Sequence, residues 1–149
     1  MRIYLAADHG GFNLKEALKK YLETQGHEVT DEGAHKLDPA DDYPDFMYPA
    51  AQKIGSDLTA RGIFLCRSGA GAAIVANKVK GVRAVVARSK EEAQHAREHN
   101  DANVVALSSD SLTAEEARDI VATFLSTSFS GEDRHLRRLK KVMQIEGNA

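Results

Sequence analysis

The sequence has one cysteine, no long apolar run and no large excess of either charge among its 149 residues. A single cysteine excludes an internal disulfide, so the thiol of Cys66 is either a small buried apolar group or a reactive one. No apolar run approaches the roughly 20 residues that span a bilayer. A formal net charge of -2 gives no sign of a nucleic-acid partner, although basic residues gather near the C-terminus.

The chain also has no internal repeat, no low-complexity tract and no shift in composition that would mark a second domain. A chain of this length is near the usual size of one domain and buries a substantial core without disulfides. The apolar run at residues 3–7 is too short and too early for the core of a signal peptide. We therefore expect one domain over residues 1–149, in the cytoplasm and without a membrane partner.

Short apolar runs rich in β-branched residues alternate with longer amphipathic stretches. Strands in such an alternation form a parallel sheet, because right-handed crossovers place the helices on both faces. We therefore predict an α/β fold, a three-layer Rossmann-type sandwich with a C-terminal helix. The predicted strands are residues 3–7, 28–30, 62–66, 82–87 and 104–107, and the predicted helices are residues 13–25, 46–58, a short helix within 66–78, 89–99, 113–125 and 132–145.

Helix boundaries carry their own signals in this sequence. Asn13 with Glu16 has the spacing of a capping box, and so does Thr113 with Glu116. Gly26 provides a C-terminal stop for the first helix. The third and fourth predicted strands are continuously apolar, which predicts that both of their faces are buried.

Ligands of parallel sheets bind beyond the carboxyl ends of the strands. This rule selects residues 7–11, 66–71 and 108–111. In the first segment, Asp8 and His9 stand beside two glycines and before a helix. Asp8 either meets a ligand or only organises the turn, since Asp and Gly are common turn residues. A turn does not require His9, so this histidine is a candidate binding residue.

Cys66 ends a predicted buried strand and is followed by Ser68, Gly69 and Gly71. The glycines let backbone N–H groups approach a ligand at a helix N-terminus, where partial positive charge favours a thiolate or a bound anion. Taken alone, a cysteine in this position is also consistent with an inert core residue. The glycine-rich turn itself is neither a Walker loop nor a GxGxxG fingerprint.

Two pairs of side chains lie four residues apart on predicted helices. His95 and His99 have the spacing of two metal ligands, but no third ligand or HExxH glutamate accompanies them, so we expect no metal. His99 near a helix end also suits a helix-dipole contact. Arg134 and Arg138 either bind an oxyanion such as phosphate or form a solvated basic face.

The segments DHGG, DDYPDF, CRSGAGAAIVANK, GVRAVVA, REHNDANV and GEDRHLRR follow one another over nearly the whole chain. Their order and spacing resemble the ribose-5-phosphate isomerase B family, which includes the galactose-6-phosphate isomerase subunits. The resemblance implies a flavodoxin-like sheet and a homodimer or dimer of dimers. It also implies interconversion of aldose and ketose sugar phosphates through an enediolate, without a metal or cofactor, as in the pentose phosphate pathway.

The resemblance also implies roles for individual residues. Cys66 would be the base that removes the proton at C2, assisted by Ser68. His99 would be the acid that opens the furanose ring, with Asp8 assisting. Both His99 and Asn100 would reach into the site of the neighbouring subunit. The other substrate-binding residues would be the loop residues Arg67, Ser68, Gly69, Ala70 and Gly71, the phosphate ligands His9, Arg134 and Arg138, and Tyr43, which would line the pocket.

The chain departs from the family pattern in its substrate loops. One branch of the family has a glutamate base after the glycine loop, but Ala72 stands there, so Cys66 is the only candidate base in the loop. Position 67 is usually glycine and is Arg67 here. The usual Gly-x-Arg after the fifth strand is replaced by residues 108–110, Ser-Ser-Asp, and the aspartate would repel a nearby phosphate.

These departures leave several functions open. Arg67 could take over part of the anion binding, or reshape the pocket for another sugar phosphate such as allose 6-phosphate or galactose 6-phosphate. A non-catalytic sugar-phosphate-binding paralogue is the alternative from another class, and retention of both acid-base residues argues against it. A plain flavodoxin-like signalling domain would need neither Cys66 nor His99.

Overall fold

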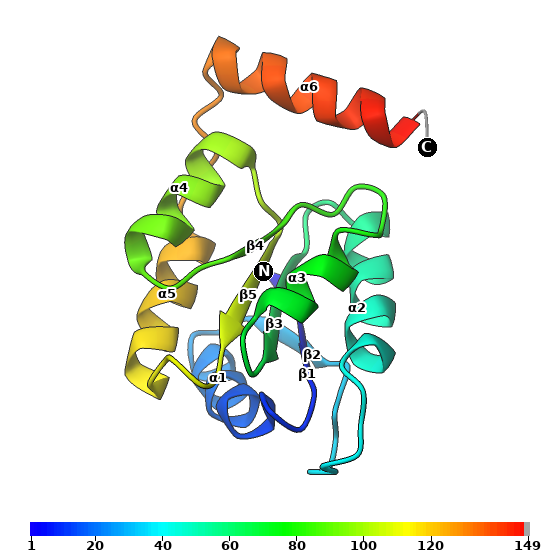
Figure 1. Ribbon diagram of the computed structural model, residues 1–149. Coiled ribbons are helices and arrows are strands. Elements are labelled where there is room, and N and C mark those ends of the chain that lie inside the picture. Colours follow the sequence, from blue (N-terminus) through cyan, green and yellow to red (C-terminus); the bar gives the residue numbers. More distant parts are fainter. Residues whose placement is uncertain (148–149) are drawn as a thin grey trace.

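The computed structural model describes residues 1–147 and has one sheet of five parallel strands between two layers of helices (Figure 1). This arrangement confirms the predicted α/β class. The strands are β1 (Arg2–Ala7), β2 (Glu28–Asp31), β3 (Arg61–Cys66), β4 (Ala84–Val86) and β5 (Val104–Ser108). The helices are α1 (Phe12–Thr24), α2 (Pro44–Ser56), α3 (Ala70–Ala76), α4 (Lys90–Asn100), α5 (Ala114–Ser126) and α6 (Asp133–Gly147).

The strands lie in the order β2-β1-β3-β5-β4. A flavodoxin-like sheet has the order 2-1-3-4-5, so the two last strands are exchanged here within the expected architecture. Because β5 is an inner strand, its carboxyl end lies beside that of β3, where Ser108 pairs with Cys66. On the other side of β3, Ala7 of β1 pairs with Leu65. The ends of three strands therefore meet at one place.

Alternate side chains of the central strands enter two separate cores, because successive residues of a strand point to opposite faces. Leu5 and Leu65 pack with side chains of α1, α4 and α5. Phe64 and Cys66 pack with side chains of α2 and α3. β3 is buried on both faces as predicted, whereas two of the three residues of β4 are only partly buried. β4 is shorter and less covered than predicted because it is an edge strand with one neighbour.

Local capping signals hold at three helix ends. The Thr113 hydroxyl accepts a hydrogen bond from the Glu116 N–H, and the Glu116 carboxylate accepts one from the Thr113 N–H, as a capping box requires. Ser89 caps α4 by accepting from the N–H of Glu92. Gly26 follows α1 with a φ of +79°, the left-handed conformation that commonly ends helices.

The predicted capping box of Asn13 and Glu16 is wrong. α1 begins at Phe12 with Gly11 as its N-cap and has no side-chain cap, so Asn13 lies inside the first turn. The turn before it is closed instead by Asp8, whose Oδ1 accepts from the Gly11 N–H at 3.1 Å. Another local contact, between residues three apart at the strand end, takes the place of the predicted cap.

Two other helices keep their predicted centres but shift at their ends. The helix predicted over residues 46–58 is Pro44–Ser56, because proline is well suited to the first helical position, where its missing N–H has no role. The helix predicted over residues 132–145 is Asp133–Gly147. Within residues 1–147, no helix is long and apolar enough to cross a membrane.

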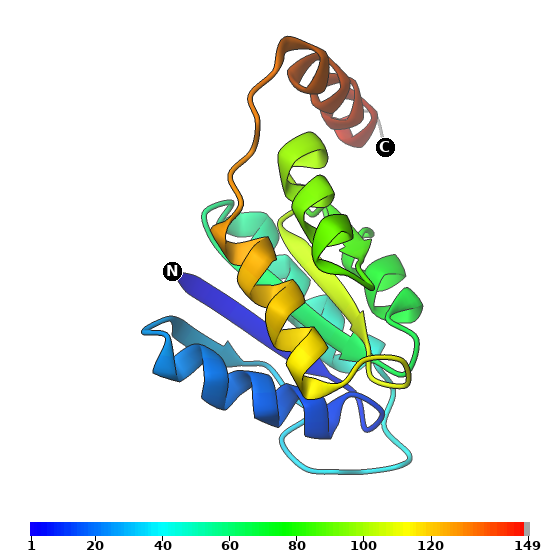
Figure 2. The ribbon, with the colours of Figure 1, turned by 90° about the vertical axis from the view of Figure 1, so that its left-hand side faces the viewer.

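α6 extends away from the three-layer body and meets it at the C-terminal end of α4 (Figures 1 and 2). His135 is buried in that contact, and its Nδ1 lies 2.7 Å from the Oγ of Ser130. Farther along the helix, Glu146 accepts a hydrogen bond from the N–H of Gly81. Apolar side chains of α6 remain exposed, among them Met143 and Ile145.

Candidate active site

Cys66 is the last residue of β3, and its thiol lies where the strand passes into the glycine loop. The residue is 5 % exposed, and its Sγ accepts a hydrogen bond from the N–H of Gly69 at 3.2 Å. Gly69 has a φ of +75°, and a Cβ there would lie 3.1 Å from the backbone carbon of Leu107. Only glycine fits this position without strain, and the resulting loop points an N–H at the sulfur, where it interacts favourably with negative charge.

Two serines at the end of β5 fix the loops on either side of them. The Ser108 Oγ donates to the carbonyl of Arg67 at 2.6 Å, and the Ser109 Oγ donates to the carbonyl of Gly10 at 2.7 Å. The N–H of Ser109 also donates to the carbonyl of Cys66. The sequence places both serines at the carboxyl end of a strand, where ligands bind, but it predicts no role for them in holding the neighbouring loops. They join the loops that carry Cys66 and His9.

Asp8 has the turn-forming role that was one of its two interpretations. Its side chain accepts the N–H of Gly11, and the residue is 6 % exposed. His9 is next to it and forms a close pair with Asp41, whose Oδ1 lies 2.7 Å from Nδ1 of His9. That hydrogen bond, with the charge of Asp8 adding to it, raises the pKa of His9 above its ordinary value, while partial burial and Arg67 oppose the rise.

The ring of Tyr43 lies against the glycine loop. A Cβ at Gly71 would lie 2.9 Å from the Tyr43 ring, so the ring covers the loop where it turns into α3. Within the loop, the Oγ of Ser68 accepts the N–H of Ala70 at 3.3 Å. Ala72, at the position of the alternative glutamate, is buried among the residues of α2 and α3.

Arg67 and Asp110, the two charged departures in the substrate loops, lie beside one another. Nη1 of Arg67 is 3.6 Å from Oδ1 of Asp110, with side-chain exposures of 66 % and 61 %. Such an exposed ion pair stabilises a fold by less than about 1 kcal/mol. The side chain of Arg67 also passes over Gly10, where its Cγ would be 2.7 Å from an added Cβ.

The other predicted residues form a second cluster where α4 meets α6. The ring centroid of His99 lies 3.9 Å from that of His95 and 4.3 Å from that of His135. Partial burial lowers the pKa of His99, the electrostatic influence of His95, His135 and Arg134 lowers it further, and Glu98 opposes the shift. Arg134 is exposed and pairs with Glu132 at 2.8 Å. Asn100 ends α4, and Arg138 lies on the exposed part of α6.

The two clusters lie at opposite ends of the sheet. Cys66 is level with Ser108 at the carboxyl end of β5, whereas Asn100 precedes Val104 at its amino end. The strand between them rises about 3.3 Å per residue, so more than about 10 Å of sheet separates the clusters. In Figure 1, α6 lies at the top of the molecule and the arrow of β5 points away from it. One chain therefore does not bring His99 to Cys66.

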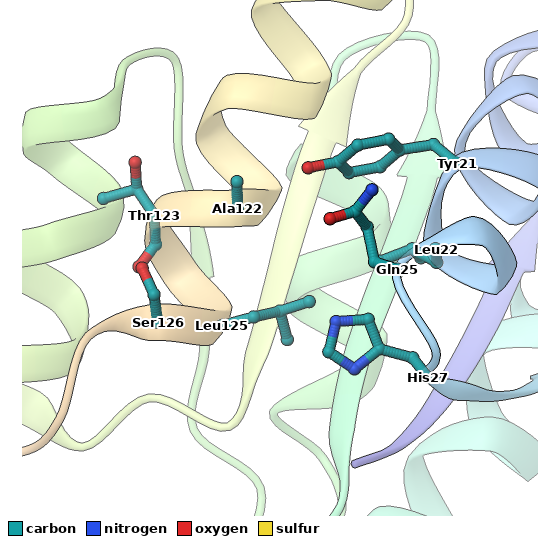
Figure 3. A pocket seen from close by; sticks show the side chains of 8 residues that line it. All are labelled: Tyr21, Leu22, Gln25, His27, Ala122, Thr123, Leu125 and Ser126. Carbon is teal, nitrogen blue, oxygen red and sulfur yellow. The ribbon is translucent and has the colours of Figure 1, made fainter.

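A pocket of about 390 Å³ lies between the C-terminal ends of α1 and α5 (Figure 3). Tyr21, Gln25 and His27 face Leu125 and Ser126 across it. It contains none of the predicted site residues and opens at the end of the sheet opposite Cys66. Within residues 1–147, no group of three or more His, Cys, Asp or Glu side chains is arranged to hold a metal ion.

The chain was compared with known proteins. The family model described as Ribose/Galactose Isomerase matches residues 3–142. Ribose-5-phosphate isomerase B of Mycolicibacterium paratuberculosis is 43% identical over 98% of this chain and 92% of its own length. A putative sugar phosphate isomerase of Bacillus subtilis, YwlF, is 36% identical over 98% and 97%.

Solved structures of ribose-5-phosphate isomerase B are also similar to this chain. Ribose-5-phosphate isomerase B of Mycoplasma genitalium, with bound ribulose-5-phosphate, superposes with a TM-score of 0.96 at 40% identity, covering 99% of this chain and 97% of that one. The enzyme of Clostridium thermocellum gives a TM-score of 0.94 at 42% identity, with 99% of both chains covered. The chain belongs to the Ribose/Galactose Isomerase family.

Proposed function

We propose that this isomerase interconverts ribose 5-phosphate and ribulose 5-phosphate, and that residues 1–149 form a single isomerase domain. The observation that carries the proposal is the near-complete superposition on a relative that holds ribulose-5-phosphate. The reaction balances within the substrate. C1 is reduced from aldehyde to alcohol while C2 is oxidised from alcohol to ketone, through an enediolate.

In this proposal, Cys66 removes the proton from C2 as a thiolate and returns it to C1. The N–H of Gly69, which lies 3.2 Å from Sγ, supports the assignment, because a backbone donor interacts favourably with a thiolate. Backbone N–H groups of the same loop, from Arg67 to Gly71, hold the enediolate oxygen in the manner of an oxyanion hole, and Ser68 lies among them. With alanine at position 72, residues 66–72 contain no carboxylate that would compete with Cys66 for the role of base.

His99 is the proposed acid for ring opening, with Asn100 holding a substrate oxygen. Its lowered pKa makes the protonated ring a stronger proton donor and a less populated one at neutral pH. Because His99 and Cys66 lie at opposite ends of one chain, we propose a homodimer, alone or as a dimer of dimers. His99 of one protomer then faces Cys66 of its partner.

The surface near His99 is suited to contact a second copy of this chain. A pocket of about 460 Å³ lies between α6 and the edge strand β4, lined in part by Val142 and Ile145. Exposed apolar side chains of this kind are typical of interaction surfaces. In the proposed dimer, Arg134 and Arg138 of one protomer and His9 of the other bind the phosphate. Tyr43 lines the pocket, and Asp8 assists the opening of the furanose ring.

Arg67 and Asp110 favour a second candidate, an isomerase of another sugar phosphate. Both residues lie on loops that border the proposed site, and they pair with one another. The charge that Arg67 presents to a substrate is thus partly offset by Asp110. A hexose 6-phosphate places its phosphate one carbon farther from C2 than ribose 5-phosphate does, so a changed charge at this rim bears directly on the choice of substrate.

The test is turnover of ribose 5-phosphate, ribulose 5-phosphate, allose 6-phosphate and galactose 6-phosphate by the purified protein, alongside Cys66→Ala. We expect isomerisation of ribose 5-phosphate and a loss of at least about 100-fold in kcat without the thiol. Wild-type rates in Cys66→Ala would reject the thiolate mechanism. Absence of turnover with all four sugars would leave a binding or structural role instead.

A further inference from the structure

Asp41 lies in the loop between β2 and α2, and its side chain is only 10 % exposed. Most other residues of this loop, from 35 to 42, are exposed. Taking a carboxylate out of water is costly unless it is hydrogen-bonded or paired with a charge. The burial of Asp41 in an otherwise exposed loop therefore calls for a specific partner.

That partner is His9. Oδ1 of Asp41 accepts the backbone N–H of His9 at 2.9 Å and lies 2.7 Å from its ring Nδ1. Two contacts to one residue fix both the backbone and the plane of the ring. A carboxylate only accepts hydrogen bonds, so Nδ1 carries a proton and Nε2, on the far side of the ring, is the atom left to meet a ligand.

The Asp41 carboxylate accepts no hydrogen bond from its own loop in the part of the chain that the structure describes. Oδ2 is buried and has no hydrogen-bond partner within residues 1–147. Buried polar atoms nearly always have a hydrogen-bond partner. It is therefore unusual that Oδ2 has none while Oδ1 makes two contacts to His9. Asp41 thus directs its hydrogen bonds to His9, whose side chain is 26 % exposed at the end of β1.

Three charged groups act on His9: Asp41 from the loop, Asp8 from the end of β1 and Arg67 from the end of β3. The hydrogen bond to Asp41 is the largest influence and raises the pKa of His9, Asp8 raises it further, and partial burial and Arg67 lower it. A raised pKa means that the ring keeps its positive charge as the pH rises past the ordinary value for histidine, and loses it only at higher pH.

We propose that Asp41 is a positioning residue, which holds the His9 ring so that its Nε2–H meets the anionic group of the substrate. The inference rests on the proposed function, in which His9 binds the phosphate. Asp41 does not touch the substrate in this arrangement. It supplies the orientation of the ring and sustains its charge, in the same way that carboxylates behind histidines orient them in other sites.

The experiment compares Asp41→Asn with the wild type. Asparagine keeps the shape and the accepting oxygen but lacks the charge. Asp45→Asn is the control, because Asp45 is an exposed carboxylate four residues along the chain. Two quantities are measured from pH 5.5 to 8.5: the pKa of the His9 ring by NMR, and the dissociation constant of inorganic phosphate by calorimetry. Steady-state kinetics with ribose 5-phosphate follow.

We expect the pKa of His9 to fall in Asp41→Asn and to stay in Asp45→Asn. Phosphate affinity should fall about tenfold near pH 7.5 and recover near pH 5.5, where the ring is protonated in both proteins. KM should follow the phosphate affinity while kcat changes little. In a His9→Gln background, Asp41→Asn should cause no further loss of phosphate affinity, because the residue acts through the ring.

An unchanged pKa of His9 would overturn the proposal, and so would a loss of affinity that is equal at all pH values or that persists in the His9→Gln background. The proposed function fails separately. If the wild type turns over no sugar phosphate, the isomerase assignment is lost, whereas the NMR titration and the binding of inorganic phosphate still decide the role of Asp41.

Discussion

At the scale of single residues, the charges around the glycine loop are coupled in pairs. Asp41 acts on His9, and Asp110 acts on Arg67 across the ends of β3 and β5. The hypothesis that Arg67 takes over anion binding must therefore include Asp110, which draws the guanidinium toward the end of β5. An incoming phosphate competes with this carboxylate for the arginine.

Replacing Arg67 should consequently change substrate binding more than stability. We expect Arg67→Gly to raise KM for ribose 5-phosphate about three- to tenfold, since a cation is removed and Asp110 is left to repel the phosphate. Asp110→Asn should lower KM or leave it unchanged. Steady-state kinetics of both variants provide the measurement, and an unchanged KM in Arg67→Gly would end the takeover hypothesis.

At the scale of secondary structure, local signals succeeded where the local chain supplies all the partners. Thr113 and Glu116 cap α5 with groups that are three residues apart, so their sequence is sufficient. Asn13 and Glu16 have the same spacing, but α1 starts earlier because Asp8, anchored at the end of β1, closes the preceding turn. Two local signals of the same spacing compete here, and the one at the strand end sets the start of the helix.

This difference gives a matched pair of variants. Thr113→Ala should destabilise the protein by about 1 kcal/mol, because it removes an N-cap hydrogen bond. Asn13→Ala should cost nothing or stabilise slightly, since Asn13 lies within the first turn of α1 and alanine is the better helix former. Urea unfolding followed by circular dichroism measures both. A larger loss in Asn13→Ala than in Thr113→Ala would contradict the assigned start of α1.

At the scale of the whole molecule, the predicted site is divided. Asp8, His9, Tyr43 and the loop of Cys66 lie at the carboxyl end of the sheet, whereas His99 lies at the other end with the residues of α6. In a two-fold dimer whose protomers lie antiparallel, the carboxyl end of one sheet faces the amino end of the other, so one site can take residues from both copies. The division is the physical reason for the proposed dimer.

A mixing experiment tests the shared site directly. Cys66→Ala and His99→Gln should each be inactive alone, and mixing them with subunit exchange should restore activity. Half of the randomly formed dimers are mixed, and each has one site with both residues intact, so recovery approaches about one quarter of the wild-type rate. A mixture of Cys66→Ala with Cys66→Ser is the control. Recovery in the control alone, or in neither, would contradict the shared site.

The sequence by itself determined the elements, the parallel sheet and the strand ends at which Cys66 and His9 stand, because periodicity, capping and turn residues act over a few positions. Only the tertiary structure decided that β5 lies between β3 and β4, which leaves β4 at the edge of the sheet. It also decided that Asp41 meets His9 across 32 residues of chain and that His99 lies far from Cys66. These contacts depend on which strands pair and where long loops return, and no local pattern encodes that choice.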